Sequence, residues 1–386
     1  MTTSDTANTE TTVEMMKPFD LRTIEKDIRN LWDQKEDASE EKKATSTRAC
    51  VSNLLVYEDQ EDEMSGLAES IIDVTQHHPC RVIVMSSKAN ALQDKLEAGV
   101  SAVCSYAPGR GKQICSEQIM VKAEGKAVAR LSASVMPLFV SDLPVNLWWR
   151  GVLVDAQPFS GLLGCSDRVI LDSSYSNRPT AFLSVLASLA RERFKEVAFS
   201  DINWSRLTQL RSHLAGLFDV PDLLVYLKDL SKVSIEFPFS TADEDLPAPQ
   251  AMLLTGWFMS RLNWGLTEDI LRSKTGATIL KFLRGEHEIT VEMTPSNKLE
   301  DQDLRLTLTM ADSTGWQEAR IVVNRNYAHN AIETKLETPT ICWLKNVARY
   351  EMPTESELIL SELEILGHDV IYENALECAA QIIEKM

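Results

Sequence analysis

Three residues in close succession, His77, His78 and Cys80, are of the types that bind zinc. Protein zinc sites use three or four such ligands, and structural sites usually supply them as two pairs at a defined spacing. No second cluster at that spacing occurs in the sequence. Histidines in the last turn of a helix also interact favourably with the helix dipole. We therefore expect His77 and His78 to end a helix, and we expect no metal site.

The segment 107–112 (APGRGK) contains Gly109 and Gly111, and glycine is the residue type that lets a backbone approach a phosphate group. It lacks the third glycine of a dinucleotide-binding fingerprint and the Gly-Lys-Ser/Thr ending of a P-loop. Both motifs also need a helix directly after the loop, whereas a strand-like run follows here. We therefore predict a turn at 107–112 and no bound cofactor.

Acid–base or nucleophilic catalysis has few candidates in this sequence. There are six histidines, there is no Gly-x-Ser-x-Gly elbow, and no cysteine lies in a recognisable catalytic signature. Asp142 and Asp172 lie at the ends of predicted elements, where active-site carboxylates often occur, although Asp142 could equally accept backbone hydrogen bonds in a turn. The pattern favours a protein that is not an enzyme and has no catalytic residues. The alternative is an enzyme or sensor that binds a sugar phosphate or a nucleotide at the carboxyl edge of the N-terminal sheet.

The elements that would position these residues centre on the strand-like run 145–150, which contains the neighbouring tryptophans Trp148 and Trp149. Successive side chains of a strand point to opposite faces, so both faces of this strand need cover. Helices on both faces of a mostly parallel sheet provide that cover. Strand-like and helical runs alternate through the N-terminal half, which predicts an α/β fold with a mostly parallel sheet covered by helices. The two indoles are then core residues, or one of them lines a ligand crevice or a partner surface.

Composition sets the expected domain limits. The first residues are polar, rich in threonine and without apolar periodicity, which predicts disorder. The apolar run 232–237 is assigned to the first sheet, and a stretch rich in proline, serine and acidic residues follows it. The predicted organisation is a disordered tail (1–16), an α/β domain (17–237), a linker (238–250) and an α+β domain (251–386).

In the C-terminal domain the apolar period changes from helical to alternating. The run 304–310 places leucine or methionine at every second position, and 288–293 and 319–323 alternate in the same way. This predicts an antiparallel meander with one solvated face. Two helices, near 355–366 and 370–384, end the chain and are expected to cover this sheet.

Bulk composition narrows the classes of partner. The chain has 386 residues, a formal net charge of −18 and a hydrophobic share of 44%. Nucleic acids and acidic membrane surfaces need basic footprints, so the charge argues against both and favours a protein partner with neutral or basic patches. Seven scattered cysteines do not form a secreted disulfide framework, and neither a signal pattern nor a membrane-spanning apolar run is evident. We expect a soluble cytoplasmic protein.

Four segments, in order along the chain, resemble the OpcA-type glucose-6-phosphate dehydrogenase assembly proteins. Segment 78–85 (HPCRVIVM) is similar to the family's H-P-x-R-x-I-V strand, and 143–151 (LPVNLWWRG) to its L-P-V-x-L-W-W segment. Segment 253–264 (LLTGWFMSRLNW) is similar to its L-x-G-W-L-x-x-R-L-x-W helix, and 201–219 (DINWSRLTQLRSHLAGLFD) to its D-L-x-W-x-R-L-T-x-W-R segment. In the last of these the matching residues are Trp204, Arg206, Leu207, Thr208 and Arg211, whereas Leu210 stands where the family often has a second tryptophan.

The resemblance implies a non-catalytic partner of glucose-6-phosphate dehydrogenase, found in cyanobacteria and some other bacteria, that favours the active oligomer or raises the affinity for substrate. In cyanobacterial members, activation is linked to thioredoxin and to cysteine oxidation, which makes thioredoxin a further possible partner. Here the two C-terminal cysteines, Cys342 and Cys378, are far apart in the sequence, so we expect buried or inert thiols and keep the two residues as the candidates for redox control.

The aromatic and arginine residues of the matched segments are the candidate contacts with a partner, because interfaces concentrate Trp, Tyr and Arg. The alternative is that they are core indoles and capping or ion-paired arginines. Residues 257, 261 and 264 are separated by helical steps of four and three and could share one helix face. The candidate partner-binding residues are Trp204, Arg206, Trp257, Arg261 and Trp264.

Overall fold

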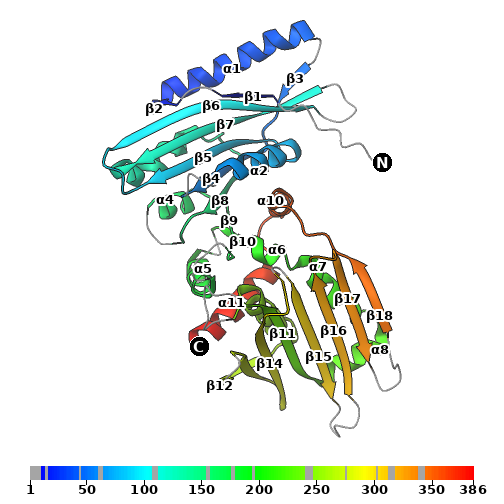
Figure 1. Cartoon of the computed structure of the whole chain (residues 1–386). Coiled ribbons are helices and arrows are strands. Elements are labelled where there is room, and N and C mark those ends of the chain that lie inside the picture. The colour runs from blue at the N-terminus through cyan, green and yellow to red at the C-terminus, as the bar shows by residue number, and fades with distance from the viewer. Residues whose placement is uncertain are drawn as a thin grey trace. The chain divides into compact units, whose positions relative to one another are not determined.

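In the computed structural model the chain divides into two compact units, each built from several stretches of sequence. Unit 1 comprises Met1–Leu171, Arg193–Ser200 and Thr354–Gly367, and unit 2 comprises Asp172–Glu192, Asp201–Pro353 and His368–Met386. The residues that the structure describes are 10–13, 16–42, 45–59, 64–106, 112–153, 157–174, 179–193, 196–239, 247–273, 276–300, 303–311, 318–337 and 344–386. Figure 1 labels the elements of both units.

Unit 1 is organised around sheet A, whose strands lie in the order β1-β6-β7-β5-β4-β8-β9-β10, with β2 paired to β6 and β3 paired to β7. The neighbouring strands β7, β5, β4, β8 and β9 pair in parallel, whereas β6 is antiparallel to β7. Trp148 and Trp149 on β8 are both buried, so both faces of this strand are covered and the predicted α/β fold is confirmed. The strands are β1 (Glu10–Val13), β2 (Lys17–Pro18), β3 (Thr45–Arg48), β4 (Ser52–Glu58), β5 (Cys80–Lys88), β6 (Lys95–Tyr106), β7 (Lys112–Glu124), β8 (Val145–Arg150), β9 (Arg168–Leu171) and β10 (Ala198–Asp201).

The helices of unit 1 include one that comes from far along the chain. In this unit α2 packs against α10, and α3 packs against α4. The helices are α1 (Leu21–Lys42), α2 (Met64–His77), η2 (Gly125–Arg130), α3 (Leu131–Val135), η3 (Met136–Leu138), α4 (Phe159–Leu163) and α10 (Glu355–Leu363). We expected the two C-terminal helices to cover the second sheet, and for α10 this prediction is wrong.

Polar contacts at both ends hold α10 in unit 1. At its start, Glu355 pairs with Arg150 of β8, and the Ser356 hydroxyl donates a hydrogen bond to Asp73 of α2 at 3.2 Å. Beyond its end, the buried Arg168 of β9 donates hydrogen bonds to the carbonyl oxygens of Ile365 and Gly367. These bonds tie the segment that follows α10 to β9.

Two segments pair differently from the sequence interpretation. Glu10–Val13, placed in the polar tail, forms β1 and pairs with β6. Lys232–Phe237, assigned to the first sheet, belongs to β11, which pairs with β14 and β15 of the second sheet. The domain limits themselves stay a prediction, because residues 1–9 and 240–246 lie outside the described part of the chain.

Unit 2 contains sheet B, in the strand order β12-β13-β14-β11-β15-β16-β17-β18. Every neighbouring pair is antiparallel except β11 and β14, so the predicted antiparallel meander is present with one parallel insertion. Alternate residues are buried and half-buried, which leaves one face of the sheet in the core and one toward solvent. The strands are β11 (Leu230–Pro238), β12 (Gly265–Arg272), β13 (Thr278–Arg284), β14 (His287–Ser296), β15 (Leu304–Ala311), β16 (Glu318–Asn326), β17 (Ala331–Glu337) and β18 (Leu344–Arg349).

The buried face of sheet B is covered by helices, with α11 packed on α9. The two helices approach closely at Gly256, where an added Cβ would lie 2.2 Å from the carbonyl oxygen of Ala375. Among the helices of the described residues, none is both long and apolar enough to cross a bilayer. The helices of unit 2 are α5 (Pro179–Arg193, whose last residue falls in unit 1), α6 (Ile202–Ser205), α7 (Thr208–Leu217), α8 (Pro221–Leu224), η4 (Val225–Asp229), α9 (Pro249–Leu262) and α11 (Val370–Lys385).

Candidate functional site

Sheet A has a topology that often positions a ligand. β4 lies between β5 and β8 and is parallel to both, and the strand order reverses here because the chain goes from β4 to β5 on one side and reaches β8 on the other side only after β7. In open α/β sheets, ligands bind beyond the carboxyl ends of the strands at such a switch point. A nucleotide or a sugar phosphate, the alternative considered from the sequence, would bind at this edge.

The carboxyl ends of β4 and β8 are instead bridged by an ion cluster. Arg150, the last residue of β8, pairs with Glu58, the buried last residue of β4, at 2.7 Å between Nε and Oε2. Glu355 of α10 binds Nη1 of the same guanidinium. The cation that a phosphate would need is therefore already engaged by two carboxylates, and those carboxylates would repel a phosphate.

Aromatic side chains fill the space beside this ion cluster. The Tyr57 and Trp149 rings stack with their centroids 3.9 Å apart, and Phe159 meets Trp149 edge-on at 4.9 Å. The Tyr57 hydroxyl lies 2.7 Å from that of Ser87 on β5. A Cβ added at Gly151 would come within 2.7 Å of the Tyr57 ring, so the close packing depends on this glycine. The edge around β4 is thus occupied by side chains of the protein itself.

Asp172, the second carboxylate singled out from the sequence, forms a bidentate pair with Arg206. The Nη2–Oδ2 and Nη1–Oδ1 distances are 2.7 and 3.0 Å. Asp201, the N-cap of α6, accepts hydrogen bonds from the backbone N–H groups of Ser173 and Asn203. Burial, assisted by the negative charge of Asp172, raises the pKa of Asp201 to about 7. Asp201 thus holds the backbone where α6 begins, and Asp172 binds Arg206 at the other end of that helix.

Trp204 ties α6 to the start of α11. Its indole N–H donates to Oδ2 of Asp369 at 3.1 Å, and Oδ1 of Asp369 caps α11 by accepting from the backbone N–H groups of Ile371 and Tyr372. The guanidinium carbon of Arg211 lies 3.4 Å from the centre of the indole, a cation–π contact. Only 2% of Trp204 is exposed, so in this conformation the indole presents almost no surface to a partner.

The three candidates on the α9 segment do not share one helix face. The helix ends at Leu262, and Asn263 adopts a left-handed conformation with a φ of 55°. The chain therefore turns back, and Trp264 is buried with its ring stacked on Phe258 at 5.9 Å. Trp257 is half-buried and Arg261 is exposed. A partner-binding role for the five candidates stays a prediction, and Trp257 and Arg261 are the two that are not largely buried.

The remaining polar candidates have local structural roles. His77 ends α2, as predicted, with its Nδ1 3.0 Å from the carbonyl oxygen of Asp73, and Nε2 of His78 lies 2.9 Å from the Ser52 hydroxyl. The part of the chain that the structure describes contains no group of three or more His, Cys, Asp or Glu residues placed to hold a metal ion. Asp142 lies in a turn with a φ of 63°. The segment 107–111 lies outside the described residues.

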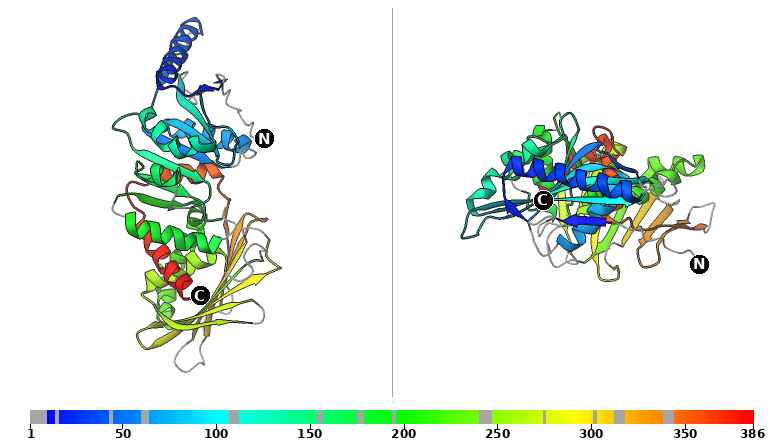
Figure 2. Two further views of the ribbon diagram at one scale, coloured as in Figure 1. Left: turned by 90° about the vertical axis from the view of Figure 1, so that its left-hand side faces the viewer. Right: turned by 90° about the horizontal axis from the view of Figure 1, so that it is seen from above.

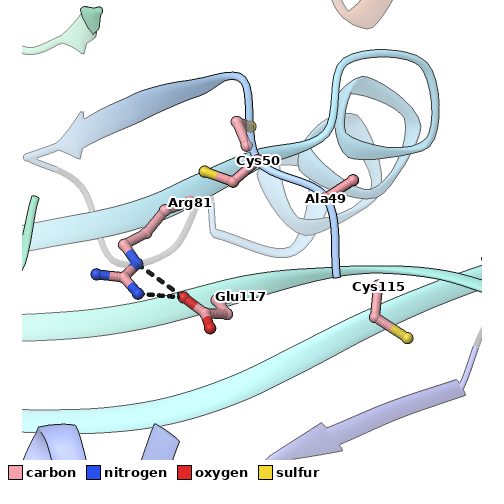
Figure 3. Close-up of a pocket in the computed structure, with 6 residues that line it drawn as sticks. Ala49, Cys50, Arg81, Cys115 and Glu117 are labelled. Atoms are coloured by element: carbon pink, nitrogen blue, oxygen red, sulfur yellow. Dashed lines mark hydrogen bonds and ion pairs between the residues drawn. The ribbon is translucent and has the colours of Figure 1, made fainter. Parts of the chain in front are cut away.

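Three cysteines and an ion pair surround a small pocket in unit 1, which has no room for a water-sized molecule (Figure 3). Arg81 and Glu117 pair beside it, and Glu117 also accepts a hydrogen bond from the indole N–H of Trp32 at 2.6 Å. The cysteines are Cys50, which is half-buried, Cys80, which is buried with its pKa raised by desolvation, and Cys115, which is disulfide-bonded.

Of the two cysteines considered for redox control, Cys378 is within the described residues. Cys378 on α11 is half-buried, and burial raises the pKa of its thiol. Because the thiolate is the reactive form, this shift lowers its reactivity. Cys342 lies outside the described residues.

Sequence reasoning missed the ion cluster of Glu58, Arg150 and Glu355. Arg150 was visible only as the residue after two tryptophans, and Glu355 lies 205 positions further along the chain. One local signal was available, since Thr354 and Glu357 form a capping box and so mark where α10 begins.

The fold and the site together define a class of two-unit protein with an α/β sheet. At the carboxyl edge of this sheet, where ligands usually bind, an ion cluster and an aromatic stack fill the space. The chain belongs to the OpcA family. A family profile described as the glucose-6-phosphate dehydrogenase subunit N-terminal domain matches residues 72–188, and one described as the C-terminal domain of that subunit matches residues 197–376.

Curated relatives carry the name OxPP cycle protein OpcA. The protein from Synechocystis is 31% identical over 209 residues, which is 52% of this chain and 40% of the relative. The protein from Nostoc punctiforme is 28% identical over 205 residues, which is 52% of this chain and 41% of the relative. The matched region thus spans about two fifths of the length of these relatives.

Solved structures show only a weak likeness. A dehydrogenase (MviM) from Clostridium difficile shares 7% identity and a TM-score of 0.38 over 86% of this chain and 98% of its own. The WlbA dehydrogenase from Thermus thermophilus, solved with NAD and α-ketoglutarate, shares 9% identity and a TM-score of 0.40 over 86% and 94%. At these values the likeness supports no conclusion about the chemistry of this chain.

Proposed function

We propose that this chain is a non-catalytic, cytoplasmic assembly factor that binds glucose-6-phosphate dehydrogenase and favours its active oligomer. The observation that carries the proposal is the pair of family profiles, which together cover most of the chain in order and are described as domains of a glucose-6-phosphate dehydrogenase subunit. Membership of a family described by this enzyme supports the enzyme as the partner, and the assembly role is part of the proposal.

The filled carboxyl edge of sheet A supports a non-catalytic role. The strand edge at which α/β proteins hold a nucleotide or a sugar phosphate is filled by the Glu58–Arg150–Glu355 cluster and by the Tyr57–Trp149 stack. A ligand there would have to separate a buried ion pair, and leaving one buried charge unpaired costs roughly 3–5 kcal/mol. The rival function, a sugar-phosphate or nucleotide enzyme or sensor at this edge, therefore has the weaker support.

An effector of this kind activates an enzyme by binding its active state more tightly than its inactive state. The difference in binding free energy sets the largest possible activation, and coupling of this type commonly amounts to about 5–150-fold. The effect does not require the effector to touch the substrate. It requires a contact surface that is complete in only one oligomeric arrangement of the enzyme.

The test uses the purified enzyme and the full chain. Initial rates are measured at sub-saturating glucose 6-phosphate while the chain is titrated, and the oligomer mass is followed by analytical ultracentrifugation, under both reducing and oxidising conditions. We expect a saturable rise in rate that coincides with a larger enzyme oligomer. An acidic protein of similar size is the control for non-specific effects. Unchanged rate and unchanged mass in all conditions would refute the proposal.

Thioredoxin is a second, conditional partner in this proposal. The thiol of Cys378 is half-buried and its pKa is raised, so we do not assign it a role in disulfide exchange. If thioredoxin acts on this chain, we expect activation of the enzyme to be unchanged when Cys378 is replaced by serine.

A further inference from the structure

The carboxyl group of Asp201 is buried in unit 2, and its two oxygens have different surroundings. Asp201 is the last residue of β10 and is 1% exposed. Its Oδ1 accepts hydrogen bonds from the backbone N–H groups of Ser173 and Asn203, at 3.0 and 2.9 Å. Its Oδ2 has no hydrogen-bond partner in the part of the chain that the structure describes. Ionised Asp201 would therefore hold buried negative charge on an oxygen to which no described residue donates, whereas a proton on Oδ2 removes that charge.

The polar side chains around Asp201 already bind other groups. Both Nη atoms of Arg206 bind the carboxylate of Asp172, at 3.0 and 2.7 Å. The side-chain amide of Asn203 donates to the Ser173 hydroxyl at 3.0 Å. If one of these donors turned toward Oδ2 of Asp201, it would break a hydrogen bond that it now makes to a buried group. Rearrangement of these side chains therefore moves the cost of ionisation without removing it.

Burial of Asp201, and then the negative charge of Asp172, raise the pKa of Asp201 to about 7. Near neutral pH this group is therefore divided between its protonated and ionised forms. Other charged groups bind α6 from several elements, while α9 contributes the neutral side chain of Gln250. These charged groups are Asp172 in the turn after β9, Arg206 at the end of α6, Arg211 of α7, Arg325 of β16 and Asp369 before α11. None of these is a histidine, the residue type that usually titrates near pH 7.

α6 is a helix of a single turn, and contacts beyond its own hydrogen bonds hold it in place. The first turn of a helix costs more conformational entropy than its hydrogen bonds return, so one turn is not stable alone. Asp201 caps the start of α6, and the pair of Arg206 with Asp172 holds its end. Between them, the Trp204 indole binds Asp369 in front of α11, the red helix that lies on one side of the yellow strands of sheet B in Figure 2. Loss of one of these contacts therefore weakens the whole turn.

We propose that Asp201 and α6 form a pH-sensitive switch, in which protonated Asp201 keeps α6 closed and loss of the proton opens the α6 segment and exposes Trp204. Opening lets water solvate the carboxylate, which the closed state cannot do, while sheet B stays folded. The open state also exposes Arg206, so two of the candidate partner contacts become accessible together. The use of this exposure for binding rests on the proposed function above, whereas the switch itself does not.

The size of the pH effect follows from the linkage between proton binding and opening. The pKa of Asp201 is about 7 in the closed state and has the ordinary value of 3.8 when the carboxyl group is solvated. The closed state therefore binds the proton more tightly, so closure is favoured at low pH and is weakened as the pH rises from about 4 to about 7. Between pH 6 and pH 8 the ratio of open to closed molecules is expected to rise about tenfold, and above about pH 8 it levels off.

Amide hydrogen exchange of the full chain, followed by NMR, measures this opening directly. The backbone N–H groups of Ser173 and Asn203 bind Asp201, and those of Arg206 and Leu207 form the hydrogen bonds that close α6. Their protection factors are compared at pH 6 and pH 8, after correction for the intrinsic effect of pH on exchange. We expect the protection of these amides to fall about tenfold at the higher pH. The measurement contains no enzyme, so its outcome is independent of the proposed function.

Two substitutions separate Asp201 from other titrating groups, and urea separates local from global opening. Asp201→Asn keeps a side-chain acceptor at the N-cap but cannot ionise, so we expect equal protection at both pH values. Asp222→Asn removes an exposed carboxylate from the first turn of α8 and should keep the tenfold change. Local opening exposes little surface, so exchange of the Asn203 amide should depend only weakly on urea.

Three results would overturn the switch. The first is equal protection of the wild type at both pH values, and the second is a pH effect that persists in Asp201→Asn. The third is a urea dependence for the Asn203 amide as steep as that of Ile235 in the interior of sheet B, because only global unfolding would then be observed. If Asp201→Asn does not fold, a ¹³C NMR titration of the Asp201 carboxyl carbon in the wild type decides. A midpoint near pH 7 supports the switch, and one near pH 4 refutes it.

Discussion

Replacing Gly256 by alanine should destabilise unit 2 through a single added methyl group. The new Cβ would lie 2.2 Å from the carbonyl oxygen of Ala375 and 2.9 Å from the backbone nitrogen of Ala379 on α11. Both are backbone atoms, so they cannot turn away from the new methyl group and the two helices must move apart. Overpacking of this kind costs about 1–3 kcal/mol. Alanine is the better helix former by about 1 kcal/mol, which offsets part of the cost.

The net loss is therefore expected to be up to about 2 kcal/mol, or a decrease in Tm of up to roughly 8 °C for a unit of this size. Gly216 on α7 provides a matched control, because an added Cβ there would have nothing within 4 Å. In Gly216→Ala only the higher helix propensity of alanine affects the stability, so we expect an unchanged or higher Tm. Differential scanning calorimetry of both variants measures the contrast. An equal or higher Tm for Gly256→Ala than for Gly216→Ala would refute the close approach of α9 and α11.

Three further variants test the polar interior. Arg150→Met removes the guanidinium that pairs with the buried Glu58 and should cost about 3–5 kcal/mol, with loss of hydrogen-exchange protection in α10. Adding Glu58→Gln should recover part of that loss, and a neutral result for the single variant would contradict the ion cluster. Asp201 has a pKa of about 7 against 3.8 unfolded, so the stability that its proton contributes is lost as pH rises from about 4 to 7. Asp201→Asn, which can keep the cap, should flatten Tm against pH over that window, whereas an unchanged slope would place the titration elsewhere. Trp204→Phe removes the hydrogen bond to Asp369 and should cost about 1–3 kcal/mol in urea unfolding, and a loss below the error of the method would show that this bond contributes nothing.

The features that the sequence predicted correctly depend on neighbouring residues. The alternation of apolar residues along β15 and the apolar run of β8 depend on neighbouring residues, so they predicted a meander and a covered sheet that the structure contains. The end of α9 also had a local cause, a left-handed Asn263, but the continuing apolar period masked it. As a result, Trp264 was expected on the helix face and is found folded back beneath it.

The position of α10 illustrates what local patterns cannot show. Its amphipathic sequence predicts a helix, but the same apolar face could cover either sheet. The choice is made by polar partners, because Arg150 and Arg168 both lie in unit 1 and bind the two ends of the α10 segment. Those arginines precede their partners in the α10 segment by 205 and 197 positions, and no spacing rule connects them to it.

By itself, the sequence determined the secondary-structure elements, the mixture of parallel and antiparallel sheets and the family, because each depends on short segments whose pattern can be read in place. Only the tertiary structure decided which charged and aromatic residues are buried. Arg150 and Arg206 became ion-paired interior residues, and Trp204 became a buried link between α6 and α11. Burial and charge pairing depend on residues that are distant along the chain and adjacent only after folding.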